Sequence, residues 1–381
     1  MDPHSSLATL TQYEKLALQA QINLSDGHAH QSPTSNQLEI LTKASEHFAS
    51  PRPPDQVDVE ETFLRSFFSL SLNVGIESAM PWMSRTQICY SASLAMEVVA
   101  NVLRLSGKRR VLVLQPTFDN IPSILTRHGL SVIAVYDEDI ANDPTIIATS
   151  EVDAVVIVAP NNPTGQSFDR SWFDALARIA EARGVVIVSD FAFRLFDPSM
   201  RWNQYDLFDG CGVSYLAIED LGKIWPTQDL KVGLLIASED LNDIVDRVHD
   251  DFILNASPFT LRLLTKLSND GPPDAVLQGI REIPRRNRLI VNRALTSVGF
   301  LDETRMASIS VAWMRLPISG GGGDEVCAMA RSKGVHVLPG HLFYFQSKDA
   351  GQRYIRLALM RDAAVVTEGC KRLKASASGT D

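Results

Sequence analysis

Near-continuous apolar runs, separated by segments of helical pattern, occupy the middle of the chain and limit what it can fold into. The runs are RVLVLQP (110–116), VDAVVIVAP (152–160), VVIVSD (185–190), YLAIED (215–220) and VGLLIAS (232–238). Strands without a polar face must be covered on both faces, which is typical of a parallel sheet between two layers of helices. Asp169 and Gly184 bracket one intervening segment as the expected N-cap and C-cap of a helix. The sequence therefore predicts an α/β fold with a mostly parallel sheet.

After residue 285 the pattern changes to an α+β segment. Its expected strands are VAWMRL (311–316), VHVLPG (335–340) and RYIRLAL (353–359). The chain has 381 residues, and single cores usually divide beyond about 250–300 residues. We therefore expect an N-terminal arm that completes the smaller domain (1–50), a large domain (51–285) and a C-terminal small domain (286–381). The proline-rich stretch ASPRPPDQ (49–56) predicts a linker after the arm.

The charge and cysteine patterns exclude several classes of function. The net charge of −9 argues against nucleic acid or an anionic membrane as a partner. The cysteines at positions 89, 211, 327 and 370 lack the spacing of a metal site or a disulfide framework, so no metal is expected. The chain has no run of about 18 apolar residues and no export signal at its start. We therefore expect a cytoplasmic protein.

Polar residues follow three of the predicted strands at their carboxyl ends. Asn162 follows the strand at 152–160, Asp190 ends the next strand, and Asp220 and Lys223 follow the third. Ligands of open α/β sheets bind outside the carboxyl ends of strands, so these side chains are expected to form a site. Each also has a plain alternative, because an isolated lysine is usually solvated, an aspartate often caps a turn, and NNPTG is a strong turn sequence.

The same residues fit the requirements of pyridoxal 5′-phosphate (PLP), which needs a lysine imine, an acid at its ring nitrogen and an anion cradle for its phosphate. Lys223 would supply the imine. Asp190 would pair with the ring nitrogen, which also explains a carboxylate at the end of an apolar strand. Asn162 would donate to the phenolic oxygen of the cofactor.

A phosphate cradle is predicted at Ser91, Ala92 and Ser93, which precede a helix expected over 94–105. Hydroxyls and free N–H groups at the start of a helix bind anions, although a plain serine N-cap gives the same sequence. Lys231 would add a balancing positive charge. Phe118 would stack on the cofactor ring, with a buried core aromatic as the alternative.

NNPTG, Asp190, Lys223, Lys231, and VLPG followed by RYIRLAL form an ordered set that resembles fold-type I aminotransferases of class I/II over nearly the whole chain. The resemblance implies a seven-stranded large domain, a homodimer, and binding of the substrate α-carboxylate by the guanidinium fork of Arg356. Phe193 stands where the family usually has a tyrosine that donates to the cofactor's phenolic oxygen.

A narrower resemblance is carried by QYEKLALQAQINLSDGHAHQ (12–31), CYSASLAMEVVA (89–100), PTFDNI (116–121) and IEDLGKIWPTQDLKVGLL (218–235). These segments resemble the PLP- and O2-dependent L-arginine oxidases, a subgroup with hydroxylases and desaturases. Asp220 stands three residues before Lys223, where aminotransferases usually have serine or threonine.

This narrower resemblance implies roles for residues of the arm. Glu14 and Asp220 would hold the substrate guanidinium. Asp26 and His28 would lie on a segment that covers the active site, with His28 positioning or activating a water molecule. Ala192 departs from a serine of the subgroup, which bears on the tuning of the cofactor oxygen.

The expected reaction is the oxidation of free L-arginine by O2 in specialised-metabolite biosynthesis, including antibiotic pathways. Its products would be 4-hydroxy-2-oxoarginine, 4,5-dehydro-2-oxoarginine or both, with H2O2 and ammonia. Three other functions stay open: a conventional aminotransferase for a basic amino acid, a PLP-dependent cyclase of hydroxyarginine, and a regulatory or binding protein without turnover.

Overall fold

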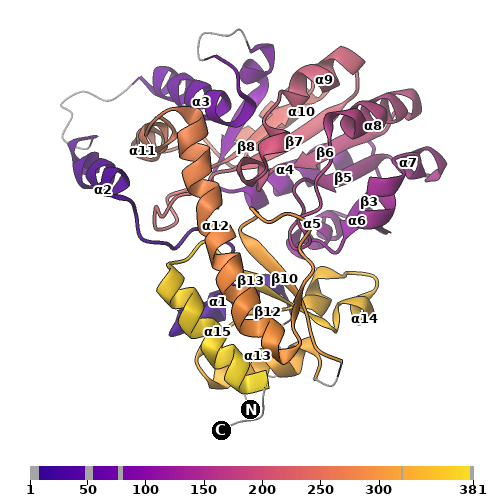
Figure 1. The fold of residues 1–381 in the computed structure, drawn as a ribbon. Helices are drawn as coiled ribbons and strands as arrows, with labels where there is room; N and C mark the ends of the chain where they lie inside the picture. Colours follow the sequence, from indigo (N-terminus) through magenta and orange to yellow (C-terminus); the bar gives the residue numbers. More distant parts are fainter. Residues whose placement is uncertain (1–7, 48–54, 76–79, 319–320, 378–381) are drawn as a thin grey trace.

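A seven-stranded sheet forms the centre of the larger part of the molecule in the computed structural model, which describes residues 8–47, 55–75, 80–318 and 321–377 (Figure 1). Its strand order is β2-β8-β7-β6-β5-β3-β4. The strands are β2 (Thr86–Cys89), β3 (Arg110–Gln115), β4 (Ser131–Tyr136), β5 (Ala154–Val158), β6 (Val186–Asp190), β7 (Tyr215–Asp220) and β8 (Gly233–Ala237). β8 runs antiparallel to both of its neighbours, and the other pairs are parallel. The predicted α/β fold with a mostly parallel sheet is confirmed.

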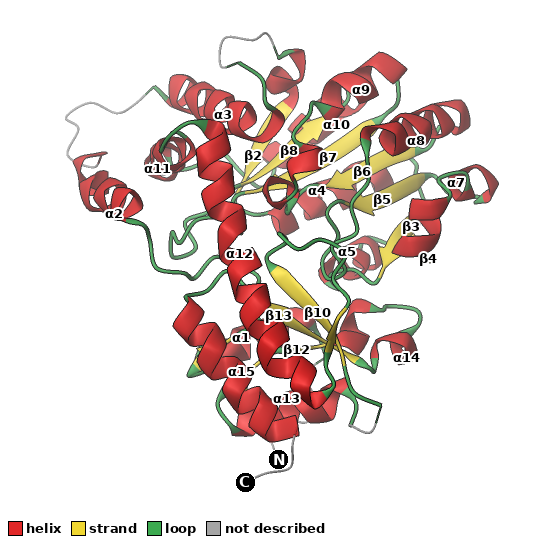
Figure 2. Ribbon diagram, in the orientation of Figure 1, coloured by secondary structure: helices red, strands yellow, loops and turns green. Residues whose placement is uncertain are grey.

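Helices cover both faces of this sheet, as the apolar strands require (Figure 2). One face packs against α3 (Gln56–Leu72), α8 (Arg170–Arg183), α9 (Gln204–Cys211) and α11 (Pro258–Ser268). The other face packs against α4 (Ala92–Leu105), α5 (Asn120–Arg127) and α10 (Glu239–Asp250). The short helices α6 (Asp137–Asn142) and α7 (Ile146–Thr149) follow β4. None of the helices in the described ranges is long and apolar enough to cross a membrane.

A second, smaller sheet has the order β12-β13-β10-β9. Its strands are β9 (Leu301–Asp302), β10 (Val311–Arg315), β12 (Leu338–Pro339) and β13 (Tyr354–Ala358). The helices around it are α13 (Gly323–Ser332), α14 (Lys348–Gly351) and α15 (Ala363–Ala377). The long helix α12 (Pro273–Leu295) contacts α3 of the large sheet's layer and α15 of the small domain, so it connects the two parts (Figure 1).

The N-terminal arm lies mainly on the small domain. α1 (Leu10–Ala17) is followed by β1 (Ile22–Asn23), which pairs in parallel with β11 (Val335–His336). The backbone then crosses towards the large sheet, since the N–H of His30 donates to Met360 and the N–H of Ala29 donates to Gly222 (3.0 and 3.4 Å). α2 (Ser35–Thr42) contacts α11. Most of the predicted linker, 49–54, lies outside the described residues, and the domain boundaries at 50 and 285 stay predictions.

Three local features differ from the sequence expectations. The helix expected to begin at residue 94 begins at Ala92, because the side chain of Ser91 caps it by accepting the N–H of Leu94 (3.2 Å). β2 was not expected from the sequence, because four residues make a weak pattern. β4 was also missed: it is an edge strand whose side chains are exposed or half-buried, so it lacks an apolar run.

Gly233 at the start of β8 is required for the close approach of this strand to the Ser91–Ala92 backbone. A Cβ there would lie 2.6 Å from the carbonyl carbon of Ser91 and 2.7 Å from the nitrogen of Ala92. We expect Gly233→Ala to lower the free energy of unfolding by about 1–3 kcal/mol through overpacking. The control is Gly210→Ala in α9, which meets no atom within 4 Å and should raise the free energy of unfolding by about 0.5–1 kcal/mol. Urea denaturation measures both, and equal effects would contradict the assignment.

Candidate active site

The carboxyl ends of β5, β6 and β7 open into a cavity of about 290 Å³. Every site residue predicted from the sequence lines this cavity: Glu14, Asp26, His28, Ser91, Ala92, Ser93, Phe118, Asn162, Asp190, Asp220, Lys223, Lys231 and Arg356. Strand direction explains the convergence, because these three strands are parallel neighbours. β8 returns antiparallel with Gly233 opposite Asp220, so the loop that carries Lys223 and Lys231 lies at the same edge.

Lys223 lies among acidic groups. Its Nζ is 3.6 Å from Oδ2 of Asp220 and 3.4 Å from Nε2 of His28. Burial works against the charged form of Lys223, but the carboxylates of Asp220 and Glu14 outweigh it and raise its pKa above the ordinary value. These carboxylates therefore hold the lysine as a cation.

Asp190 is a buried carboxyl at the end of β6. It accepts the N–H of Ala192 at 2.9 Å. Burial raises its pKa to about 6, against the opposing effects of this N–H and of Lys223. A carboxylate that is costly to bury fits a cationic partner in the cavity, and a protonated pyridine nitrogen has this character.

The turn before α4 has the features of an anion cradle. Ser91 caps the helix, and the hydroxyl of Ser93 accepts the side-chain N–H of Asn120 (2.9 Å). Nζ of Lys231 lies in the same cavity, 2.8 Å from Nε2 of His28. The helix N-terminus, the hydroxyls and the lysine charge together fit the phosphate of PLP. The residues present therefore match each part of the cofactor.

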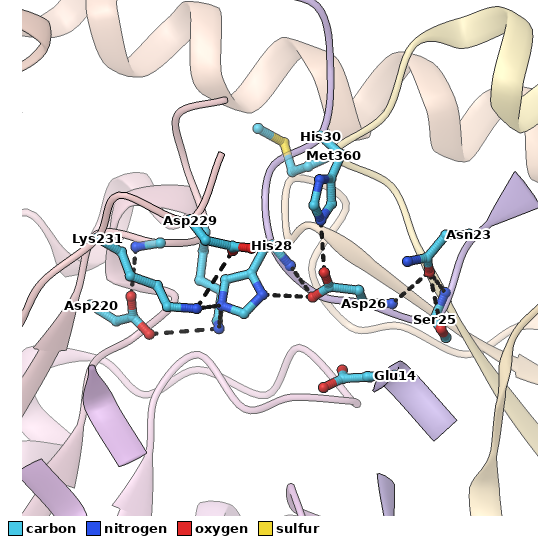
Figure 3. A network of polar contacts seen from close by, with 12 residues as sticks. Glu14, Asn23, Ser25, Asp26, His28, His30, Asp220, Asp229, Lys231 and Met360 are labelled. Carbon is cyan, nitrogen blue, oxygen red and sulfur yellow. Dashed lines mark hydrogen bonds and ion pairs between the residues drawn. The ribbon is translucent and has the colours of Figure 1, made fainter. Parts of the chain in front are cut away.

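Asp26 links His28 and His30, two histidines of the arm. We call the segment Asn23–His28 the arm turn. The carboxylate of Asp26 contacts Nδ1 of His28 (2.6 Å) and Nε2 of His30 (2.7 Å), and Figure 3 shows His28 between Asp26 and Lys231. Burial opposes ionisation of Asp26, but the hydrogen bonds from His28 and His30 outweigh it and hold its pKa below the usual range.

His28 is held in its neutral form. The charge of Lys223, together with burial, lowers the pKa of His28 below its ordinary value despite Asp26. A neutral ring whose Nδ1–H donates to the carboxylate of Asp26 leaves Nε2 as an acceptor on the cavity side, facing Lys231. The arrangement can accept a proton or orient a water molecule at Nε2.

Arg356 is fully buried on β13 and faces the arm. Its Nη2 lies 3.4 Å from Oε1 of Glu14 and also donates to the carbonyl of Ser25, and its Nη1 lies 3.5 Å from Oδ1 of Asn162. Burial raises the pKa of Glu14 to about 7, although Arg356 opposes this. Glu14 comes from α1, so the first helix among the described residues contributes directly to the cavity wall.

The sequence reasoning missed Arg361 and Asn120. Arg361 is buried and donates to three carbonyls of the arm turn. Asn120 lines the cavity beside Ser93. Arg361 follows a strand as a surface arginine would, so its position gave no signal. Asn120 looked like an ordinary residue at the start of a helix.

The raised pKa of Asp190 predicts how stability depends on pH. An acid whose folded-state pKa is raised contributes stability at low pH that is lost as the pH rises to the folded value. In the cofactor-free protein, Asp190→Asn should therefore gain stability relative to wild type between pH 3.8 and about 6, by up to about 3 kcal/mol.

Thermal melts across this pH range measure the difference. The control is Asp143→Asn, because hydrogen bonds from Thr145 lower the pKa of the exposed Asp143 and place its titration below the range. If the stability of Asp190→Asn relative to wild type does not increase with pH over this range, the raised pKa of the buried Asp190 carboxyl is contradicted.

Comparison with known proteins gives the family of the chain. Residues 81–373 match the model of aminotransferase class I and II. LL-diaminopimelate aminotransferase of Oleidesulfovibrio alaskensis is 27% identical over 216 residues, which are 56% of this chain and 54% of that protein. Aspartate aminotransferase of Sulfolobus acidocaldarius is 20% identical over 338 residues, 83% of this chain and 80% of that protein. The chain thus spans about half the length of the first relative.

Solved structures agree with this assignment. MppP soaked with the product 2-ketoarginine superposes with a TM-score of 0.86 at 29% identity, covering 93% of this chain and 99% of that one. Aspartate aminotransferase from Thermus thermophilus with maleate gives a TM-score of 0.77 at 18% identity over 97% of both chains, a likeness of fold. With the family model covering most of the sequence, the chain belongs to the aminotransferase class I and II family, whose members use pyridoxal phosphate.

Proposed function

We propose that this protein is a PLP-dependent enzyme that oxidises free L-arginine with O2. The observation that carries the proposal is that Glu14 and Asp220 line the same cavity as Lys223 and Arg356. Membership of the family accounts for a site that holds PLP and the carboxylate of an amino acid. The two additional carboxylates suit a substrate whose side chain is a cation.

PLP, when bound, withdraws electrons from the α-carbon of an amino-acid substrate, so that bonds at this carbon can break. Lys223 would hold the cofactor through Nζ and later take the Cα proton. Asp190 would keep the ring nitrogen protonated. The phenolic oxygen would face Asn162, and the ring would lie against Phe118. The phosphate would lie against Ser91, Ala92, Ser93 and Lys231.

The substrate would be held at both ends. Arg356 would bind the α-carboxylate, and Glu14 and Asp220 would bind the guanidinium. The cavity lining contains four acidic side chains (Glu14, Asp26, Asp190, Asp220) and three permanently basic ones (Lys223, Lys231, Arg356). The dianionic phosphate would pair with Lys231. Carboxylates would then outnumber basic groups where the substrate side chain lies, which favours a cationic side chain over a neutral or acidic one.

The MppP structure supports arginine as the substrate. That protein was soaked with 2-ketoarginine as its product, and 2-ketoarginine is the 2-oxo acid that forms when L-arginine loses its amino group. The alignment covers 93% of this chain and 99% of that one, so the likeness extends over nearly the whole of both proteins.

The oxygen chemistry is supported by the resemblance of the arm and of the Lys223 loop to arginine oxidases. Atom balance requires two O2 per L-arginine for the 4-hydroxy-2-oxo or the 4,5-unsaturated product, with one ammonia and two H2O2 released. Addition of water at Cγ distinguishes the two products, and His28 would position or activate this water. Ala192 and Phe193 supply no hydroxyl to the cofactor oxygen, which would tune its acidity.

A conventional aminotransferase for a basic amino acid is the second candidate. Two curated relatives favour it, because they are named LL-diaminopimelate aminotransferase and aspartate aminotransferase. Such an enzyme would transfer the amino group to a keto acid and consume no O2. In either case a homodimer is expected from the family.

Oxygen stoichiometry separates these candidates. Holoenzyme with L-arginine in an oxygen electrode should take up two O2 per ammonia released, and mass spectrometry should find the hydroxylated or unsaturated 2-oxo acid. One O2 per ammonia would indicate simple oxidative deamination. No uptake, together with amino transfer to 2-oxoglutarate, would reject the oxidase proposal. Heat-inactivated enzyme is the control for non-enzymatic uptake.

Asp220 should determine selectivity for a cationic side chain. Asp220→Asn removes a charge-assisted hydrogen bond, worth about 1.5–3 kcal/mol, so kcat/KM for L-arginine should fall by about 10–100-fold. Because Asp220 also lies 3.6 Å from Lys223, the measured quantity is the ratio of kcat/KM for L-arginine to that for L-norleucine, a neutral amino acid of similar length. If the substitution leaves this ratio unchanged, Asp220 does not bind the guanidinium.

A further inference from the structure

Arg361 makes an unusual set of contacts with the arm turn. Its side chain is 3% exposed. Nε donates to the carbonyl of Asn23 at 2.8 Å, one terminal nitrogen to Asp26 at 2.6 Å, and the other to His28 at 2.7 Å. One guanidinium therefore satisfies three carbonyls from six consecutive residues.

The guanidinium remains charged in this position. Burial lowers the pKa of Arg361 to about 10, which is still well above neutral pH. Its planar fork presents donors in fixed directions, so three carbonyls that bind it are fixed relative to one another. The side chain of Asn23 adds two contacts inside the turn by accepting the N–H groups of Ser25 (3.0 Å) and Asp26 (3.1 Å).

The conformation of the arm turn decides where His28 points. The N–H of His28 donates to Oδ1 of Asp26 at 3.0 Å, and the same oxygen contacts Nδ1 of the ring at 2.6 Å. The ring is thereby oriented with Nε2 3.4 Å from Nζ of Lys223. Arg361 does not line the cavity, and its hydrogen bonds to the arm turn are its connection to His28.

We propose that Arg361 is a positioning residue that fixes the arm turn and so places the Asp26–His28 pair against Lys223. It lies five residues after Arg356, just beyond the end of β13. The arginine proposed for the substrate carboxylate and the arginine that holds the turn therefore share one segment of the small domain. The catalytic part of this inference rests on the proposed function of His28, and the structural part does not.

Hydrogen–deuterium exchange on the holoenzyme tests the structural part. Arg361→Met should increase exchange across residues 24–29 by at least about tenfold, because the turn loses three hydrogen bonds. Arg353→Met is the matched control. Arg353 donates to the carbonyls of Leu316, Pro317 and Ile318 in the same domain, so its loss should leave exchange at 24–29 unchanged. Unchanged exchange in Arg361→Met would overturn the proposal.

A double-mutant cycle with His28→Ala tests the catalytic part. If Arg361 acts through His28, Arg361→Met lowers the hydroxylated fraction of product several-fold in the wild-type background and has no further effect in His28→Ala. Equal effects of Arg361→Met in both backgrounds would show a general structural role for Arg361 and would overturn the catalytic part of the proposal.

If Arg361→Met does not fold, Arg361→Lys replaces it: the single ammonium keeps the charge but cannot span three carbonyls, so intermediate exchange is expected, and wild-type exchange would overturn the proposal. If wild-type enzyme takes up no O2 with L-arginine, the proposed function fails, whereas the exchange measurement still decides whether Arg361 holds the turn.

Discussion

The parallel pairing of β5, β6 and β7 is the constraint on which the rest of the molecule depends. Both faces of these strands are covered by helices, so a charged group inside a strand needs a buried partner. Glu219 within β7 has one in Arg194 at 2.7 Å. Uncompensated polar groups are tolerated where the strands end, and parallel strands end at one edge. Asn162, Asp190 and Asp220 meet there for this reason, and the antiparallel return of β8 adds Lys223 and Lys231.

The electrostatics of the cavity follow from this concentration of carboxyl groups. Glu14 and Asp190 have raised pKa values because they are buried, whereas Asp26 keeps its charge through two histidines. Asp220, together with these carboxylates, keeps Lys223 cationic, and the charge of Lys223 lowers the pKa of His28. The protonation state of each group is thus set by its neighbours, and the carboxylates of the cavity favour cationic ligands. The proposal of a guanidinium-bearing substrate uses this property.

The arm joins the two domains at the site. β1 adds to the small domain through β11, and the backbone at residues 24–30 bonds to the β13 segment and to Gly222 of the large domain. Asp26 and His28 are therefore positioned by small-domain contacts, while the ring of His28 faces Lys223 and Lys231 of the large domain. The relative position of the domains must therefore affect the distance from His28 to Lys223. The contacts of Arg361 bear on this distance because they hold the arm turn on the small domain.

The sequence alone determined the fold class and the polar residues at the strand ends that line the cavity. Apolar runs such as 152–160 and 185–190 specify buried strands without tertiary information, and the polar residues that follow them can then only lie at one edge. Resemblance of short segments supplied Glu14 and His28, which local patterns alone would have left in a polar tail. Only the tertiary structure placed Glu14 beside Arg356 and revealed Arg361 within the arm turn. Those contacts join residues more than 300 positions apart, as in Arg356 and Glu14 or Arg361 and Asp26. Strand periodicity is a local property of the chain, whereas the partner of a buried charge is chosen by packing.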